Sequence, residues 1–178
     1  MEVIKTDIEG VLLIRPTVYT DARGDFRETY REKRYQDAGI DCKFVQDNLV
    51  HSTKHVFRGL HFQLPPYEQA KLITMIRGRI LDVALDLRKN SKTFKKMLMI
   101  ELSAETGDQL FIPEGFAHGY YVQSEEACIS YKVSAPYAPD HQSGIRWDEF
   151  ELHLRKYMRD PILSEQDKAL PKLKDVLK

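Results

Sequence analysis

Apolar segments in this chain are short and separated by turn residues, which limits the folds that it can adopt. Segments rich in Val, Ile, Leu, Phe and Tyr alternate with clusters of Gly, Pro, Asp and Asn. Glu32 to Ala38, ended by Gly39, is the best early helical segment, and short helices are expected between Ser164 and Leu170. We therefore predict one mainly β domain over residues 1–178, a jelly-roll barrel with a few short helices.

The strand boundaries follow from the turn residues that flank each apolar segment. Asp21 to Asp25 is expected to form a turn, and Pro65 and Pro66 interrupt the chain after the fourth strand. The predicted strands are Gly10 to Pro16, Phe26 to Tyr30, Phe44 to Ser52, Val56 to Gln63, Lys71 to Ile76, Ile80 to Leu87, Lys95 to Leu102, Gln109 to Ile112, His118 to Gln123 and Ala127 to Val133.

The charge balance and the cysteines narrow the class of protein. Lys plus Arg equals Asp plus Glu at 27 each, so the composition gives no electrostatic case for a nucleic-acid partner. Cys42 and Cys128 are the only cysteines, too few for a disulfide framework or a thiolate metal site. The apolar run Val11 to Ile14 is too short for a signal-peptide core or a membrane span. These features predict a soluble, cytoplasmic protein without a membrane segment.

Three basic side chains lie in segments that otherwise have the composition of sheet core. Arg58, His61 and Lys71 fall within fourteen residues, and a buried cation or imidazole is costly unless it is paired or takes part in a site. Because side chains alternate between the two faces of a strand, Arg58 and His61 should point to opposite faces. We hypothesise that a bulge at Gly59 brings both of them into one pocket.

The same alternation places more titratable groups on inward faces. Lys71, His118 and Tyr131 each share a face with mainly apolar neighbours. A lone strand histidine is more often a core residue, but a cluster of titratable groups indicates a site, with a ligand in the mouth of the barrel. Asp82 and Asp86 are either charge partners for this cluster or part of a solvated face.

A catalytic metal is not predicted. A metal site in a small barrel needs closely spaced histidines, and no histidine lies two positions after His61. His51 and His55 are four residues apart but flank a turn rather than sharing a helix face.

Two loops and one strand carry weaker signals. The charged turn from Asp21 to Glu28 surrounds Gly24 with arginines that could bind an anion, although such turns are usually only solvated. Gln46 and Asn48 offer amides suited to a polar ring or to hydroxyls. Tyr137, in a loop stiffened by prolines, is either a surface turn residue or a platform on which a ring stacks.

Several ordered blocks along nearly the whole chain resemble the dTDP-4-dehydrorhamnose 3,5-epimerase family of cupins. The blocks are Asp21 to Glu28, Phe44 to Asn48, Arg58 to Gln63, Gln69 to Leu72, Asp82 to Arg88, Ile112 to Gly119, Tyr131 with Lys132, and Leu163 to Asp167. The resemblance implies a cupin-like jelly roll that acts on a nucleotide sugar without a cofactor or a metal.

The resemblance also implies roles for individual residues. His61 would be the base, Tyr131 the acid on the opposite face, and Asp167 the carboxylate that orients the histidine. Lys71 would face the C4 oxygen of the sugar. In the remaining assignments, Arg58, His118, Gln46 and Asn48 line the sugar-diphosphate cavity, Tyr137 stacks on the base, and Arg23 and Glu28 are lent by the neighbouring subunit of a homodimer.

These residue types suit the chemistry that the family performs. A C4 ketone acidifies the protons at C3 and C5 of a hexose, so a histidine base, a cation near the ketone oxygen and a far-side acid are sufficient. The chain departs from the family pattern at Gln142, where Glu is frequent, at Gln166, where Lys is usual, and at Phe62, where Tyr is frequent. A mono-epimerase, a non-catalytic sugar-nucleotide-binding cupin and a metal-dependent cupin oxygenase are the alternatives.

Overall fold

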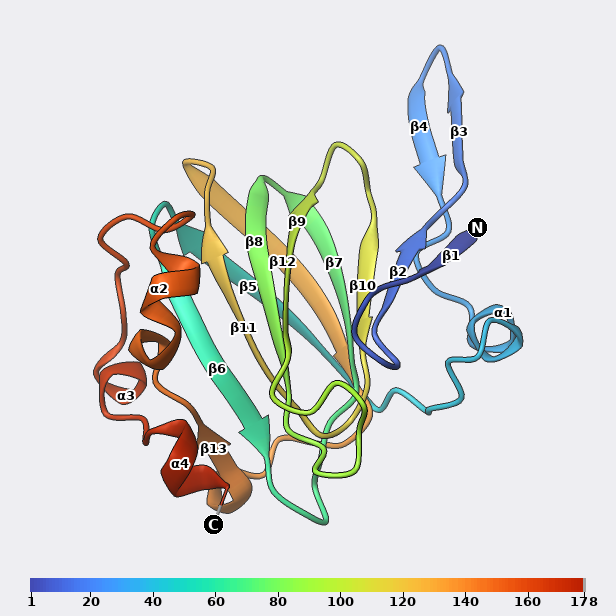
Figure 1. Cartoon of the computed structure of the whole chain (residues 1–178). Coiled ribbons are helices and arrows are strands. Elements are labelled where there is room, and N and C mark those ends of the chain that lie inside the picture. Colours follow the sequence, from blue (N-terminus) through green and yellow to red (C-terminus); the bar gives the residue numbers. More distant parts are fainter. Residues whose placement is uncertain (178) are drawn as a thin grey trace.

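Two antiparallel sheets face each other in the computed structural model, which describes residues 1–177 (Figure 1). One has the order β1 (Glu2–Lys5), β2 (Leu12–Arg15), β10 (Gln109–Ile112), β7 (Lys71–Arg77), β12 (Glu126–Val133), β5 (Gln46–Thr53). The other has the order β13 (Gln142–Gly144), β6 (Phe57–Gln63), β11 (Phe116–Val122), β8 (Arg79–Asp86), β9 (Met97–Ser103). This arrangement confirms the predicted mainly β jelly roll.

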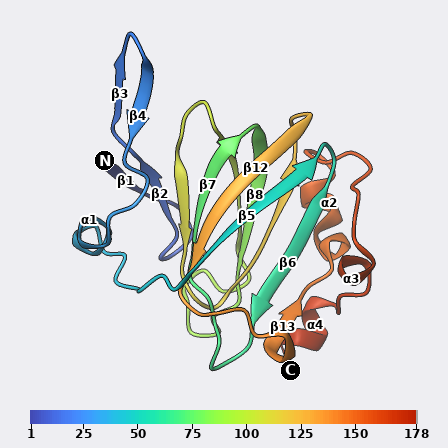
Figure 2. The ribbon, with the colours of Figure 1, turned by 180° about the vertical axis from the view of Figure 1, so that it is seen from behind.

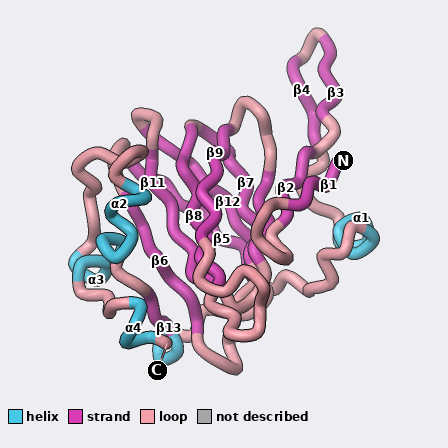
Figure 3. The backbone as a smooth tube through the Cα atoms, in the orientation of Figure 1, coloured by secondary structure: helices cyan, strands magenta, loops and turns pink. Residues whose placement is uncertain are grey.

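A small hairpin and several short helices complete the fold. The hairpin pairs β3 (Val18–Asp21) with β4 (Gly24–Arg27) and projects away from both sheets (Figure 1). The helical elements lie at the periphery (Figure 3): α1 (Glu32–Asp37), η1 (Pro139–His141), η2 (Trp147–Phe150), α2 (Glu151–Leu154), α3 (Glu165–Lys168) and α4 (Leu173–Val176). None of the helices in residues 1–177 has the length and hydropathy needed to cross a bilayer.

Apolar side chains form three layers, one between the sheets and one on the outer side of each sheet. The central layer lies between the sheets and includes Ile73 of β7 and Ala84 of β8. A second layer, including Leu85, lies beneath the C-terminal helices, which lie beside β6 and β13 in both views (Figures 1 and 2). A third lies beneath α1 and includes Tyr35 and Leu72. Burying one such leucine or isoleucine fully stabilises the fold by about 1.5–3 kcal/mol.

All ten predicted strands overlap strands of the structure, as does the helix predicted from Glu32, while β1, β3 and β13 were not predicted. β3 is exposed along its whole length, so it shows no alternation of apolar and polar residues. β13 has the sequence Gln-Ser-Gly and contains no apolar side chain. Both are recognisable only by their pairing, which a sequence pattern does not contain.

The pairing of β6 with β11 contains the predicted bulge. His61 pairs with His118 and Arg58 pairs with Tyr120, so one step of three residues in β6 faces a step of two in β11. The extra residue reverses the alternation, and Arg58 and His61 therefore border the same cavity. Gly59 makes this possible, because it has φ 122° and a Cβ there would lie 2.6 Å from Cα of Gly119.

We expect Gly59→Ala to be far more destabilising than Gly24→Ala. Gly24 has a similar φ of 124°, but nothing lies within 4 Å of a Cβ at that position, so both variants carry the backbone strain and only Gly59→Ala adds a clash. The free energy of unfolding from urea titrations should fall by about 2 kcal/mol more for Gly59→Ala. Equal losses for the two variants would contradict this account of the bulge.

Candidate active site

Two adjoining cavities open between the sheets, and the same three side chains border both. The inner chamber has a volume of about 310 Å³ and the outer chamber about 270 Å³. His61, Lys71 and Tyr131 line both of them. His61 comes from β6 in the five-stranded sheet, whereas Lys71 and Tyr131 come from β7 and β12 in the six-stranded sheet. The three groups therefore reach the shared space from opposite walls.

His61 is held by a carboxylate from the far end of the chain. Nε2 of His61 lies 2.5 Å from Oδ1 of Asp167, which is 4 % exposed. Because the carboxylate can only accept, Nε2 carries the shared proton and Nδ1 is left for a ligand. The side chain of His61 is 28 % exposed, which is enough for contact with a molecule in the chambers.

Asp167 is itself fixed by the start of α3. The hydroxyl of Ser164 donates to Oδ2 of Asp167 at 2.8 Å and accepts from the backbone N–H of Asp167 at 3.1 Å. Burial alone would raise the pKa of Asp167, but hydrogen bonds from His61 and Ser164 and the charge of His61 hold it below its usual value. Asp167 therefore remains an anion that orients the imidazole.

Tyr131 keeps its proton at neutral pH. Burial raises the pKa of its phenol, and the nearby guanidinium of Arg58 only partly opposes this effect. Arg58 is oriented by a hydrogen bond of 3.1 Å from its Nε to the hydroxyl of Ser52. A phenol in this position can donate a proton to a ligand in the shared space.

Lys71 lines both chambers and brings a cationic group to the space that they share. The loss of water contacts lowers the pKa of its ammonium group to about 8, and the negative charge of Asp82 opposes this effect. Lys71 can therefore hold a positive charge at neutral pH in the low-dielectric space where a charge acts most strongly.

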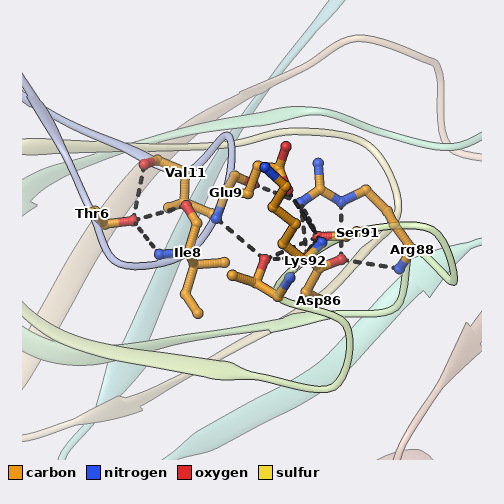
Figure 4. Close-up of polar contacts among 9 residues, drawn as sticks. Thr6, Ile8, Glu9, Val11, Asp86, Arg88, Ser91 and Lys92 are labelled. Carbon is orange, nitrogen blue, oxygen red and sulfur yellow. Dashed lines mark hydrogen bonds and ion pairs between the residues drawn. The ribbon is translucent and has the colours of Figure 1, made fainter.

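His118, which lines the inner chamber, forms a second imidazole–carboxylate pair with Asp82. Nε2 of His118 lies 3.0 Å and 2.9 Å from the two oxygens of Asp82, and Asp82 is fully buried. The alternative of a solvated face for Asp82 and Asp86 was therefore wrong, since Asp86 is also fully buried. Asp86 is not part of the cluster: it accepts hydrogen bonds from Arg88, Ser91 and Thr93 in the polar network of Figure 4.

Amide side chains dominate the outer chamber. Nε2 of Gln46 donates to Asn48 at 2.9 Å, and Oε1 of Gln46 accepts from the backbone N–H of Tyr137 at 3.0 Å. The hydroxyl of Tyr137 donates to Gln142 at 2.5 Å. Tyr137 as a whole is 56 % exposed. Gln63 and Gln69 complete the set of amides. This wall offers donors and acceptors without a carboxylate, and an exposed ring at its edge.

Two of the predicted site residues lie outside the chambers of their own chain. Arg23 is in the turn of the β3–β4 hairpin, where its guanidinium pairs with Asp21 at 2.6 Å. Glu28 follows the hairpin and pairs with Arg34 at 3.1 Å. Neither residue lines the chambers that contain His61. The other predicted site residues line one chamber or both: His61, Tyr131, Asp167, Gln46, Asn48, Arg58, Lys71, His118 and Tyr137.

The structure adds lining residues that the sequence patterns did not indicate. Val50, Ile73 and Ile129 form an apolar part of the inner chamber, and Gln166 lies at its edge. The strand alternation that places Lys71 on an inward face could also have placed Val50, Ile73 and Ile129. It could not have shown that they line a cavity, because an apolar side chain has the same pattern in a cavity wall as in the packed core. Among the described side chains, those of residues 1–150 and 153–177, no group of three His, Cys, Asp or Glu side chains is arranged to hold a metal ion.

Comparison with known proteins decides the family. The sequence profile described as dTDP-4-dehydrorhamnose 3,5-epimerase matches residues 5–175. The chain belongs to this family. It is 46 % identical to the dTDP-4-dehydrorhamnose 3,5-epimerase of Shigella flexneri, over 94 % of this chain and 93 % of that protein. The resemblance seen in the sequence is thereby confirmed.

Solved structures of family members have the same fold. The enzyme of that name from Bacillus anthracis, with TDP and PPi bound, has a TM-score of 0.93 and 42 % identity, covering 97 % of this chain and 99 % of that one. The dTDP-6-deoxy-D-glucose-3,5-epimerase from Legionella pneumophila, in complex with dTDP-4-keto-L-rhamnose, has a TM-score of 0.92 and 38 % identity, covering 99 % and 94 %. The predicted cupin-like architecture is confirmed by this likeness.

Proposed function

We propose that the chain is an isomerase that inverts C3 and C5 of dTDP-4-keto-6-deoxyglucose to give dTDP-4-dehydrorhamnose. The observation that carries the proposal is the placement of a carboxylate-held imidazole and a protonated phenol on opposite walls of one space. A single face of the sugar cannot both lose and regain a proton if its configuration is to change. Groups on opposite walls meet this requirement.

In the proposed reaction, Nδ1 of His61 removes the proton from the carbon next to the ketone. The electron pair of the broken C–H bond delocalises onto the C4 oxygen, and the ammonium of Lys71 stabilises the enolate that forms. One well-placed donor of this kind contributes about 3 kcal/mol to transition-state stabilisation. Tyr131 then returns a proton from the other wall, and the ketone is restored. Exchange with water then removes the proton from His61 and returns one to Tyr131, so the same steps can serve C3 and C5 in turn.

The rest of the site binds and positions the nucleotide sugar. Arg58 and His118 face the inner chamber, where the sugar would lie, and the amides of Gln46 and Asn48 face the outer chamber. The exposed ring of Tyr137 offers a stacking surface for the base. The steps use only side chains, and we propose that neither a cofactor nor a metal takes part.

We also propose a homodimer in which each chain lends its hairpin to the other chain's site. Tyr19 is 63 % exposed and Phe26 is 67 % exposed, which suits burial against a second copy. Arg23 lies at the tip, where it could bind the diphosphate or nucleoside. The free thiols Cys42 and Cys128 fit a reducing compartment, and we propose the cytoplasm.

The reaction is tested by NMR in heavy water with dTDP-4-keto-6-deoxyglucose. The wild type should place deuterium at both C3 and C5, and His61→Ala should lower the rate at least about 100-fold because the base is lost. His51→Ala is the matched control, since His51 is exposed on β5 and should leave the rate unchanged. Deuterium at only one carbon would indicate a mono-epimerase, and exchange by His61→Ala at the wild-type rate would refute the base assignment.

The lent hairpin is tested by subunit complementation. If Arg23→Glu and His61→Ala chains are refolded together, half of the dimers are mixed and each mixed dimer contains one intact site, so about a quarter of wild-type activity should return. The control is a mixture of His61→Ala and Tyr131→Phe chains, in which both defects lie in the chain's own cavity and no activity should return. The absence of recovery in the first mixture would show that each chain uses its own hairpin.

A further inference from the structure

The imidazoles of two imidazole–carboxylate pairs lie side by side on one wall of the inner chamber. His61 and His118 are direct partners in the pairing of β6 with β11. Each ring uses Nε2 to meet its own carboxylate, Asp167 for His61 and Asp82 for His118. The proposed reaction assigns the first pair to proton removal, whereas it leaves the carboxylate of the second pair without a role.

The hydrogen bonds of His118 fix the orientation of its ring and show which ring nitrogen carries a proton. Both oxygens of Asp82 face Nε2 of His118 at 3.0 Å and 2.9 Å, so this nitrogen carries a proton. Asp82 therefore sets the rotation of the ring. Among the side chains that the structure describes, those of residues 1–150 and 153–177, Nδ1 of His118 has no hydrogen-bond partner. It is also not among the fully buried polar atoms without a partner. His118 lines the inner chamber, and Nδ1 is the ring nitrogen that Asp82 leaves available to a ligand there.

Asp82 also acts on Lys71 across the space between the sheets. The titratable groups that line the inner chamber with Lys71 are Arg58, His61, His118, Tyr120, Tyr131 and Asp167. The oxygens of Asp167 are already engaged by His61 and Ser164. Asp82 is the group whose charge raises the pKa of Lys71, against the lowering caused by the loss of water.

We propose that Asp82 is a positioning residue of the epimerase site, which turns Nδ1 of His118 toward the sugar and supplies the negative charge that balances the ammonium of Lys71. This inference rests on the proposed function. One buried carboxylate on β8 thus serves two groups on different sheets: the ring of His118 through a hydrogen bond, and Lys71 through its charge.

Asp86 provides a matched control for Asp82. Both are fully buried carboxylates on the inward-facing side of β8, four positions apart. Neither carboxylate lines a chamber itself, but the partner of Asp82 is His118, which lines the inner chamber. Asp86 is bound at the end of the strand by Arg88, Ser91 and Thr93, none of which lines either chamber (Figure 4). Asp82→Asn and Asp86→Asn each remove one buried charge, so a general loss of stability affects both, whereas only Asp82→Asn changes the charge balance at Lys71.

The first measurement is the pH dependence of kcat/KM. A cation that must be charged is active below its pKa and is lost as the pH rises, so the wild type should lose activity above pH 8, near the pKa of about 8 for Lys71. Asp82→Asn should shift the alkaline limb to a pH about one unit lower, because the pKa of Lys71 falls when the negative charge near it is lost. Asp86→Asn should leave the limb in place. Asp82→Glu keeps the charge, so its limb should stay near that of the wild type while kcat falls.

The second measurement needs no substrate. A long-range ¹H–¹⁵N spectrum of the histidine rings should show Nε2 of His118 protonated in the wild type and in Asp86→Asn, and a changed signal for this ring in Asp82→Asn. A wild type that exchanges no deuterium would contradict the proposed function. An active wild type, with an unchanged limb and unchanged His118 signals in Asp82→Asn, would overturn the role of Asp82 alone.

Discussion

Charged groups inside this sandwich depend on partners, because burying a single charge in a low-dielectric interior is very costly. Two buried carboxylates serve the imidazoles that line the inner chamber, and each is matched to a named partner: Asp167 to His61 and Asp82 to His118. This matching lets the fold hold reactive groups where most sandwiches place only apolar side chains. It also ties the C-terminal segment to the barrel, because Asp167 lies 106 residues from His61.

The two chambers between the sheets differ in the chemistry of their walls. Charges and imidazoles gather in the inner chamber beside an apolar patch that includes Ile73 and Ile129, whereas neutral amides gather in the outer chamber. A ligand with a reactive, partly apolar ring at one end and a polar heterocycle at the other matches both. His61, Lys71 and Tyr131 line both chambers, so they can transfer protons at the reactive end of the ligand while the amides hold its other end.

Much of this arrangement follows from the sequence, and the part that does not has a physical reason. Strand alternation placed Lys71, His118 and Tyr131 on inward faces, because alternation depends only on the chain's own backbone. The bulge at Gly59 could only be suggested from the sequence, since it depends on how closely β6 approaches Gly119 of β11. Asp82 and Asp86 were indistinguishable by the same rule: both face inward, and only the neighbouring strands and loops decide that one meets His118 and the other Arg88. Partners supplied by distant segments are invisible to a local pattern.

The central claim is that a base and an acid act on one sugar from opposite sheets, and Tyr131→Phe tests it most directly. With dTDP-4-keto-6-deoxyglucose in heavy water, this variant should still exchange substrate protons through His61 at a rate within about tenfold of the wild type, while formation of inverted product falls at least about 100-fold. Tyr120→Phe is the control, because this buried phenol lines the same chamber from the sheet of His61 and should leave inversion intact. Inversion at the wild-type rate in Tyr131→Phe would contradict the account.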